Sequence, residues 1–109
     1  MLDNEGKTII EKIKQAADDV WGDNYEIEDI VVEKAPFCLF NLYMCVCQRQ
    51  YVRLSYDRSI IDIAIEVDGN YVWLTDLTDQ KVVEGFASNK PENILRNFKV
   101  LDTVLRKLE

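Results

Sequence analysis

Hydrophobic residues recur at helical spacing at both ends of the chain, which predicts one amphipathic helix at each end. The first helix is expected over residues 4–21 and ends at Gly22. The second is expected to follow Asn89, which forms a capping-box pattern with Glu92 around Pro91. Their apolar positions are, in turn, Ile9, Ile10, Ile13, Ala16, Ala17, Val20 and Trp21, and Ile94, Phe98, Leu101, Leu105 and Leu108.

Between the two helices the hydrophobic residues recur with a period of two, which is typical of strands with one buried face. The clearest stripe comprises Ile61, Ile63, Ile65 and Val67. The strand that follows Pro36 is largely hydrophobic on both faces, which indicates a central position in a sheet. The expected strands cover residues 25–32, 37–47, 50–56, 60–67, 70–75 and 81–86.

The dipeptide Asp68-Gly69 predicts a hairpin, and its register decides where two aromatic residues lie. A two-residue loop pairs Ile65 with Val72 and places Tyr71 and Trp73 on the face opposite the isoleucines. A three-residue loop with a bulge places both rings on the isoleucine face. Aspartate and glycine at the two loop positions favour the first register.

The order of elements is therefore helix, about five to six strands, helix, with mostly short connections. Short connections favour antiparallel neighbours. The predicted fold is a single α+β domain over residues 1–109. It consists of a twisted antiparallel meander sheet with the N-terminal and C-terminal amphipathic helices packed on one face.

Charge is distributed unevenly along the 109 residues. The formal net charge is −7, and all of it falls in residues 1–33, which contain ten acids and three lysines. An acidic surface repels nucleic acid and anionic membranes and attracts basic partners. The longest apolar run, residues 42–47, is far too short to span a bilayer. The N-terminus shows no secretory signal pattern and three cysteines cannot all pair, so a cytoplasmic protein is expected.

The composition excludes much common enzyme chemistry. The chain has no histidine, which removes the commonest general base and most zinc sites. Its four glycines are isolated from one another, so no phosphate-binding loop is present. No enzymatic activity, metal or cofactor is expected. An acid–base role would require a pocket lined by Asp57, Asp62 or Asp76 with a raised carboxylate pKa.

Two surfaces are candidate partner-binding sites. The first is an acidic segment, residues 18–33, in which aromatic residues are interleaved with acids and no base occurs. The second is a set of aromatic and arginine side chains expected on the open sheet face, together with the turn arginine Arg58. The alternative for each is a solvated or helix-covered surface. The residues concerned are Asp18, Asp19, Trp21, Asp23, Tyr25, Glu26, Glu28, Asp29 and Glu33 for the first, and Tyr43, Tyr51, Arg53, Arg58, Tyr71 and Trp73 for the second.

The layout, together with residues 54–63, which read LSYDRSIIDI, resembles small bacterial immunity proteins. Those proteins protect a cell against polymorphic or contact-dependent toxins. The resemblance implies a bacterial, cytoplasmic antitoxin that binds and blocks one cognate toxin, often a nuclease with a basic surface, as a monomer or a homodimer. Two alternatives are a dimeric chaperone like those of type III secretion and a phage inhibitor that mimics nucleic acid. The chaperones usually carry a helix between two groups of strands, for which this sequence leaves no room.

Overall fold

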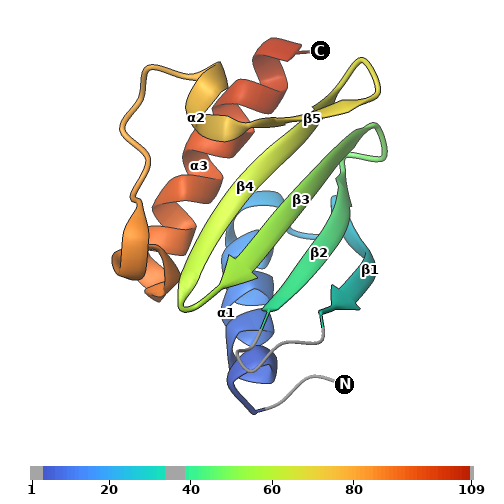
Figure 1. Cartoon of the computed structure of the whole chain (residues 1–109). Coiled ribbons are helices and arrows are strands. Elements are labelled where there is room, and N and C mark those ends of the chain that lie inside the picture. The colour runs from blue at the N-terminus through green and yellow to red at the C-terminus, as the bar shows by residue number, and fades with distance from the viewer. Residues whose placement is uncertain (1–3, 34–38, 109) are drawn as a thin grey trace.

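A computed structural model describes residues 4–33 and 39–108 of the chain. It confirms an α+β fold in which one antiparallel sheet is backed by two long helices (Figure 1). The elements are α1 (Asn4–Trp21), β1 (Tyr25–Val32), β2 (Leu39–Val46), β3 (Gln50–Asp57), β4 (Ile60–Val67), β5 (Asn70–Trp73), the short α2 (Leu74–Leu77), the 3-10 helix η1 (Gly85–Asn89) and α3 (Pro91–Leu108).

The five strands follow one another across the sheet in chain order, and each pairs antiparallel with the next. Both long helices lie behind this sheet in the view of Figure 1 and contact each other. Within residues 4–33 and 39–108, the opposite face of the sheet is therefore not covered by either long helix. None of the described helices is long and apolar enough to cross a membrane.

The core lies between the sheet and the two helices. Most inward positions of β2, β3 and β4 are buried, as are most of the apolar positions of α1 and α3. Gly22, with a φ of +59°, ends α1 in the left-handed conformation that glycine adopts readily. Tyr56 and Phe40 stack within this core with ring centroids 5.2 Å apart.

The β4–β5 hairpin has the two-residue loop. Ile65 pairs with Val72, and Asp68 and Gly69 both have positive φ, as a type I′ turn requires. The outer face of the sheet therefore holds Tyr71 and Trp73.

The β3–β4 hairpin has the same geometry with less suitable residues. Asp57 pairs with Ile60, and the two loop residues between them are Arg58 and Ser59, with φ of 52° and 70°. Side chains with a Cβ resist this left-handed region, so this turn holds backbone strain that glycine would relieve.

Three expectations near the C-terminus are wrong. Residues 81–86 form no strand: an irregular segment leads into η1. The strand expected over residues 70–75 ends at Trp73, where α2 begins. Asn89 belongs to η1, and Lys90 is the N-cap whose carbonyl accepts the first hydrogen bond of α3. The part of the expected strand at residues 37–38 lies outside the described residues.

Candidate functional site

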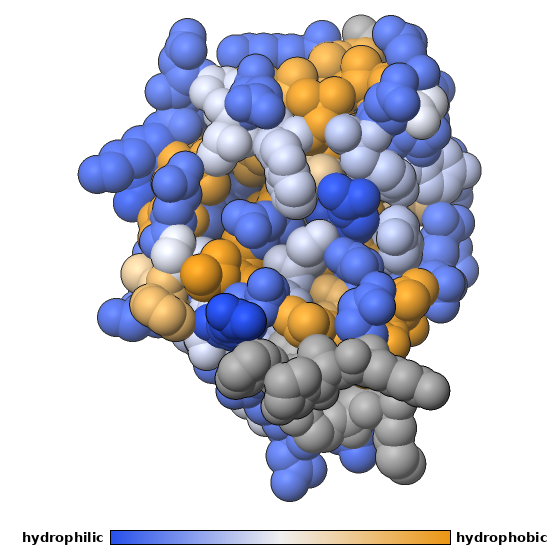
Figure 2. Space-filling model, viewed as in Figure 1, coloured by the Kyte–Doolittle hydropathy of each residue, from blue (hydrophilic) through white to orange (hydrophobic). Residues whose placement is uncertain are grey.

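The uncovered face of the sheet carries the aromatic and arginine side chains that the alternation predicted. Cross-strand pairing brings them together: Tyr43 lies opposite Arg53, Arg53 opposite Ala64, and Ala64 opposite Trp73. Seen from this side, hydrophobic residues form small separate areas among hydrophilic and weakly polar ones (Figure 2). We call the set Tyr43, Tyr51, Arg53, Tyr71 and Trp73 the sheet platform.

Arg53 stands at the centre of the platform. Its Cζ atom lies 4.9 Å from the ring centroid of Tyr71 and 5.3 Å from that of Trp73, within the range of cation–π attraction. Tyr43 meets Tyr71 edge to face, with centroids 6.1 Å apart. Ala64 between them is fully buried although it faces outwards. Within the described residues the Arg53 Nε atom is buried without a hydrogen-bond partner, so the rings hold the guanidinium in place.

The strand residues that share the outer face with this cation include six acids. The five strands contain six acids and one base, Arg53, which gives the sheet a formal charge of −5. Burial, together with the negative charge of Glu66 and Glu28, raises the pKa of the Tyr71 hydroxyl. These carboxylates therefore act on the platform itself. The six acids are Glu26, Glu28, Asp29, Asp57, Asp62 and Glu66.

The acidic segment expected as one surface is divided between two elements. Glu26 and Asp29 lie on β1 opposite Cys45 and Tyr43, with a bulge between them, and so border the platform. Asp18 and Asp19 lie near the end of α1 instead, and Asp23 follows in the turn after it. Only the part of this segment on β1 joins the sheet platform.

The two aromatic residues of that segment are not available as anchors in the way the sequence suggested. Trp21 is buried in the core, where its ring packs against Phe98 and its indole N–H donates to Asp102 Oδ1 at 3.1 Å. The hydroxyl of Tyr25 donates to Asp18 Oδ1 at 2.6 Å. Burial, followed by this hydrogen bond and the charge of Asp18, raises the pKa of Tyr25 to about 12.

Arg58 lies in the exposed β3–β4 turn, away from the aromatic cluster. Its Nε atom is 3.6 Å from Oδ1 of Asp57. Both side chains of this pair are largely exposed, so the pair contributes little to stability.

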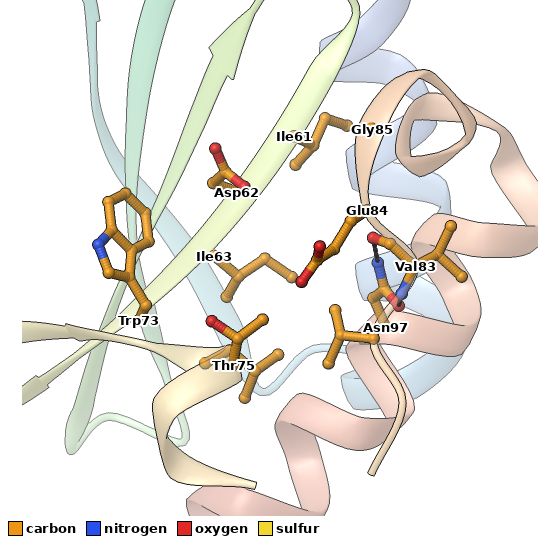
Figure 3. Close-up of a pocket in the computed structure, with 11 residues that line it drawn as sticks. Ile61, Asp62, Ile63, Trp73, Thr75, Val83, Glu84, Gly85 and Asn97 are labelled. Carbon is orange, nitrogen blue, oxygen red and sulfur yellow. Dashed lines mark hydrogen bonds between the residues drawn. The ribbon is translucent and has the colours of Figure 1, made fainter. Parts of the chain in front are cut away.

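A pocket of about 370 Å³ adjoins the platform at the edge of β4. Figure 3 shows Asp62 on β4, Trp73 at the end of β5, and Glu84 reaching towards β4 from the segment after α2. We call this cavity the edge pocket. Trp73 lines it and also stacks on Arg53, so pocket and platform form one continuous surface. Burial, then the charges of Glu84 and Asp57, raises the pKa of Asp62.

The edge pocket exists because residues 82–85 stand away from β4 instead of pairing with it. The buried amide of Asn97 on α3 takes the place of a strand partner: it accepts from the Val83 N–H at 3.1 Å and donates to the Val83 carbonyl at 3.3 Å. Ser88 Oγ accepts from the Ile61 N–H at 2.9 Å, which satisfies one buried amide at the unpaired edge of β4. The side chains of Asn97 and Ser88 thus fix the backbone on the two sides of the edge pocket.

Sequence reasoning missed two residues here. Glu84 and Phe86 were expected in a strand, yet Glu84 lines the pocket and Phe86 is 72% exposed beside Gly85 of the pocket wall. A sequence signal was present in Gly85, because an isolated glycine inside a strand pattern often marks an irregularity. Its φ of +74° bears this out.

The cysteines offer little chemistry. Cys45 is buried, and burial, followed by the charges of Glu28 and Glu26, raises the pKa of its thiol, which disfavours the reactive thiolate. Cys47 is exposed in the β2–β3 turn, and Cys38 lies outside the described residues. Among the described residues no group of three or more cysteine, aspartate or glutamate side chains is arranged to hold a metal ion.

The geometry assembles a fixed arginine, four aromatic rings, a ring of acids and a pocket on one open sheet face. Comparison of the chain with protein-family models, curated protein sequences and solved structures finds no match.

Proposed function

We propose that this protein is a non-enzymatic inhibitor of the immunity type, which binds a basic protein domain through the sheet platform. The observation that carries the proposal is the guanidinium of Arg53, which lies over the rings of Tyr71 and Trp73 on a sheet face whose strands carry a charge of −5. Arginine, tyrosine and tryptophan are the residues that most often dominate binding energy at protein interfaces.

The exposure of these side chains supports a binding role. Tyr51 and Trp73 are 41% and 42% exposed, whereas Val52, next to Tyr51 on the other face, is fully buried. Aromatic side chains are large and have few rotatable bonds, and the Trp73 ring is also in contact with Arg53, so little conformational entropy is lost when a partner covers them.

Charge indicates the kind of partner. A basic domain is attracted to the acids around the platform, and this attraction speeds encounter and disfavours acidic competitors. A second copy of the chain would bring the same acids face to face, with only Arg53 to offset them. A heterologous basic partner therefore fits this face better than a homodimer.

The alternatives explain less of the surface. An acid–base enzyme would use Asp62 and Glu84 and leave the platform without a role. A secretion chaperone of the expected layout has a helix between strand groups, whereas the described residues of the segment from β1 to β5 contain none. The antitoxin role is taken from the resemblance to immunity proteins, and a toxin nuclease with its basic phosphate-binding cleft is the partner of the expected charge.

The test begins with identification of the partner and ends with a binary measurement. Affinity capture from the source cells, and the product of the neighbouring reading frame, supply candidate basic proteins. Each purified candidate is then measured by surface plasmon resonance against wild type, Arg53→Ala and Trp73→Ala. Removal of a central anchor typically costs 2 kcal/mol or more, which is roughly a thirtyfold rise in Kd. The wild-type association rate should also fall as salt rises.

The matched control is Lys14→Ala, because Lys14 is an exposed residue of α1 in the helix layer. It should leave Kd unchanged. If a toxin that this protein inhibits bound Arg53→Ala and Trp73→Ala as tightly as wild type, the platform would not be the interface.

A further inference from the structure

The edge pocket is negatively charged and lacks a cation of its own. Asp62 and Glu84 both line it, and none of its lining residues is basic. Among the described residues neither carboxylate forms an ion pair or accepts a hydrogen bond. Both side chains are exposed, and the negative charge of Glu84 contributes to the raised pKa of Asp62, so a cation placed between them would relieve their mutual repulsion.

The walls of the pocket suit one kind of cation. Trp73 supplies an aromatic ring, and the Arg53 Cζ atom lies 5.3 Å from its centroid, so this ring already accepts one guanidinium. Ile61 and Ile63 supply apolar surface for the methylene groups of a long side chain. A volume of about 370 Å³ lies within the 300–1,000 Å³ range of small-ligand pockets.

The pocket wall is also fixed before any ligand arrives. The Asn97 amide holds both backbone polar groups of Val83, the residue before Glu84 (Figure 3). A preordered wall reduces the entropy lost on binding. The edge pocket is therefore a built cavity and not a gap between mobile segments.

We infer that the edge pocket is the receptor for an arginine side chain of the partner, with the guanidinium against the Trp73 ring and between the carboxylates of Asp62 and Glu84. The inference rests on the proposed function in naming a partner protein as the source of the arginine. Arginine is favoured over lysine because its planar guanidinium both stacks on aromatic rings and donates paired hydrogen bonds to carboxylates.

In the proposed complex this surface would hold two arginines, one from each protein. Arg53 is the protein's own cation and contacts Trp73 from the platform. The partner's arginine would contact Trp73 from the edge pocket. The burial and like charges that raise the pKa of Asp62 are opposed by a bound guanidinium, so binding should lower that pKa. The basic partner expected from the charge of the sheet thus gains a specific contact residue.

The experiment uses capped arginine (N-acetyl-arginine methylamide) as the probe and the full chain as the receptor. Capped citrulline is the matched ligand, because it has nearly the same shape without the charge. Heteronuclear NMR should show a saturable shift of the Trp73 indole N–H with capped arginine, with a dissociation constant in the millimolar range, and no saturable shift with capped citrulline. The Trp21 indole N–H, bonded to Asp102 in the core, is an internal reference that should not move.

A double variant with isosteric neutral side chains tests the carboxylates. The combination of Asp62→Asn and Glu84→Gln should weaken the binding of capped arginine about tenfold or more. Hydrogen bonds to charged groups contribute about 1.5–3 kcal/mol. The control Asp79→Asn removes an exposed acid that belongs to neither the pocket nor the platform, and should change affinity less than twofold. Equal shifts with citrulline, or unchanged affinity in the double variant, would overturn the inference. Neither result depends on a protein partner, whereas Arg53→Ala tests the proposed function independently.

Discussion

At the scale of single residues, the two tryptophans show that the same residue type can be part of the core or of an exposed surface. Trp21 ends a helix whose apolar stripe faces the core, so its ring is 6% exposed and its N–H reaches Asp102 on α3. Trp73 has an outward position on an uncovered sheet and is 42% exposed. In sequence both stand near acids, and only the layer to which each element belongs separates them.

Tyr25 gives a residue-scale prediction on pH. Its pKa of about 12 exceeds the unfolded value of about 10, so the folded state holds the hydroxyl proton more tightly. The resulting stabilisation is complete below pH 10 and is lost as the pH rises towards 12. We therefore expect the free energy of unfolding of wild type to fall more steeply across this window than that of Tyr25→Phe.

Urea denaturation at a series of pH values measures this difference, and the absorbance of tyrosinate follows the ionisation directly. Tyr51→Phe is the matched control, because it removes an exposed tyrosine and leaves the Tyr25–Asp18 hydrogen bond intact. A Tyr25→Phe curve parallel to that of wild type would show that the bond to Asp18 adds nothing in solution.

At the scale of elements, the two hairpins that flank β4 form a natural pair. Ser59 and Gly69 each occupy the second position of a two-residue loop, with φ of 70° and 86°. A residue with a Cβ costs roughly 1–2 kcal/mol in this conformation. Ser59→Gly should therefore raise the free energy of unfolding by about 1 kcal/mol, after part of the gain is offset by the greater freedom of glycine in the unfolded chain.

The reverse exchange, Gly69→Ser, is the control for that prediction and should lower stability by a similar amount. A Cβ at Gly69 meets no atom within 4 Å, so any loss reflects the backbone alone. Both midpoints are measured in urea by circular dichroism. A destabilising Ser59→Gly would mean that the serine side chain contributes more than the strain of its backbone.

How well these elements can be predicted from the sequence depends on the sequence separation of the contacts that form them. The helices, β1 to β4 and the Asp68-Gly69 register follow from local periodicity and turn chemistry. The platform was predictable for the same reason, since alternation assigns Arg53 and Trp73 to one face. The edge pocket was not, because residues 82–85 are held by Asn97, 14 residues away, and Ile61 by Ser88, 27 residues away. Such side-chain contacts leave no periodic signal.

At the scale of the whole molecule, charge is sorted between the two layers. The inner face of the sheet is apolar, so the acids of β1, β3 and β4 gather on the open face, where Arg53 is the one base among the strand residues. The two long helices contain six acids and seven lysines and arginines, so together they carry a formal charge of +1. Like charges that share a face repel one another, so the fold retains this arrangement at a cost in stability.

That cost should depend on salt. Raising sodium chloride from about 10 mM to about 150 mM shortens the Debye length from about 30 Å to about 8 Å and screens the repulsion. We expect the free energy of unfolding of wild type to rise by roughly 1 kcal/mol, since each like-charged pair costs about 0.2–1 kcal/mol. A triple variant, Glu26→Gln, Glu28→Gln and Asp29→Asn, should be more stable at low salt and show a smaller rise.

The matched control neutralises three acids of the helix layer, through Glu5→Gln, Glu11→Gln and Glu92→Gln. Glu5 and Glu92 lie in the first turns of α1 and α3, where negative charge is favourable, and Glu11 is 3.9 Å from Lys14. This control should be no more stable than wild type at low salt and should keep the full salt response. Equal responses in the two triple variants would mean that the open face carries no excess repulsion, and a basic partner would then gain nothing there from relieving it.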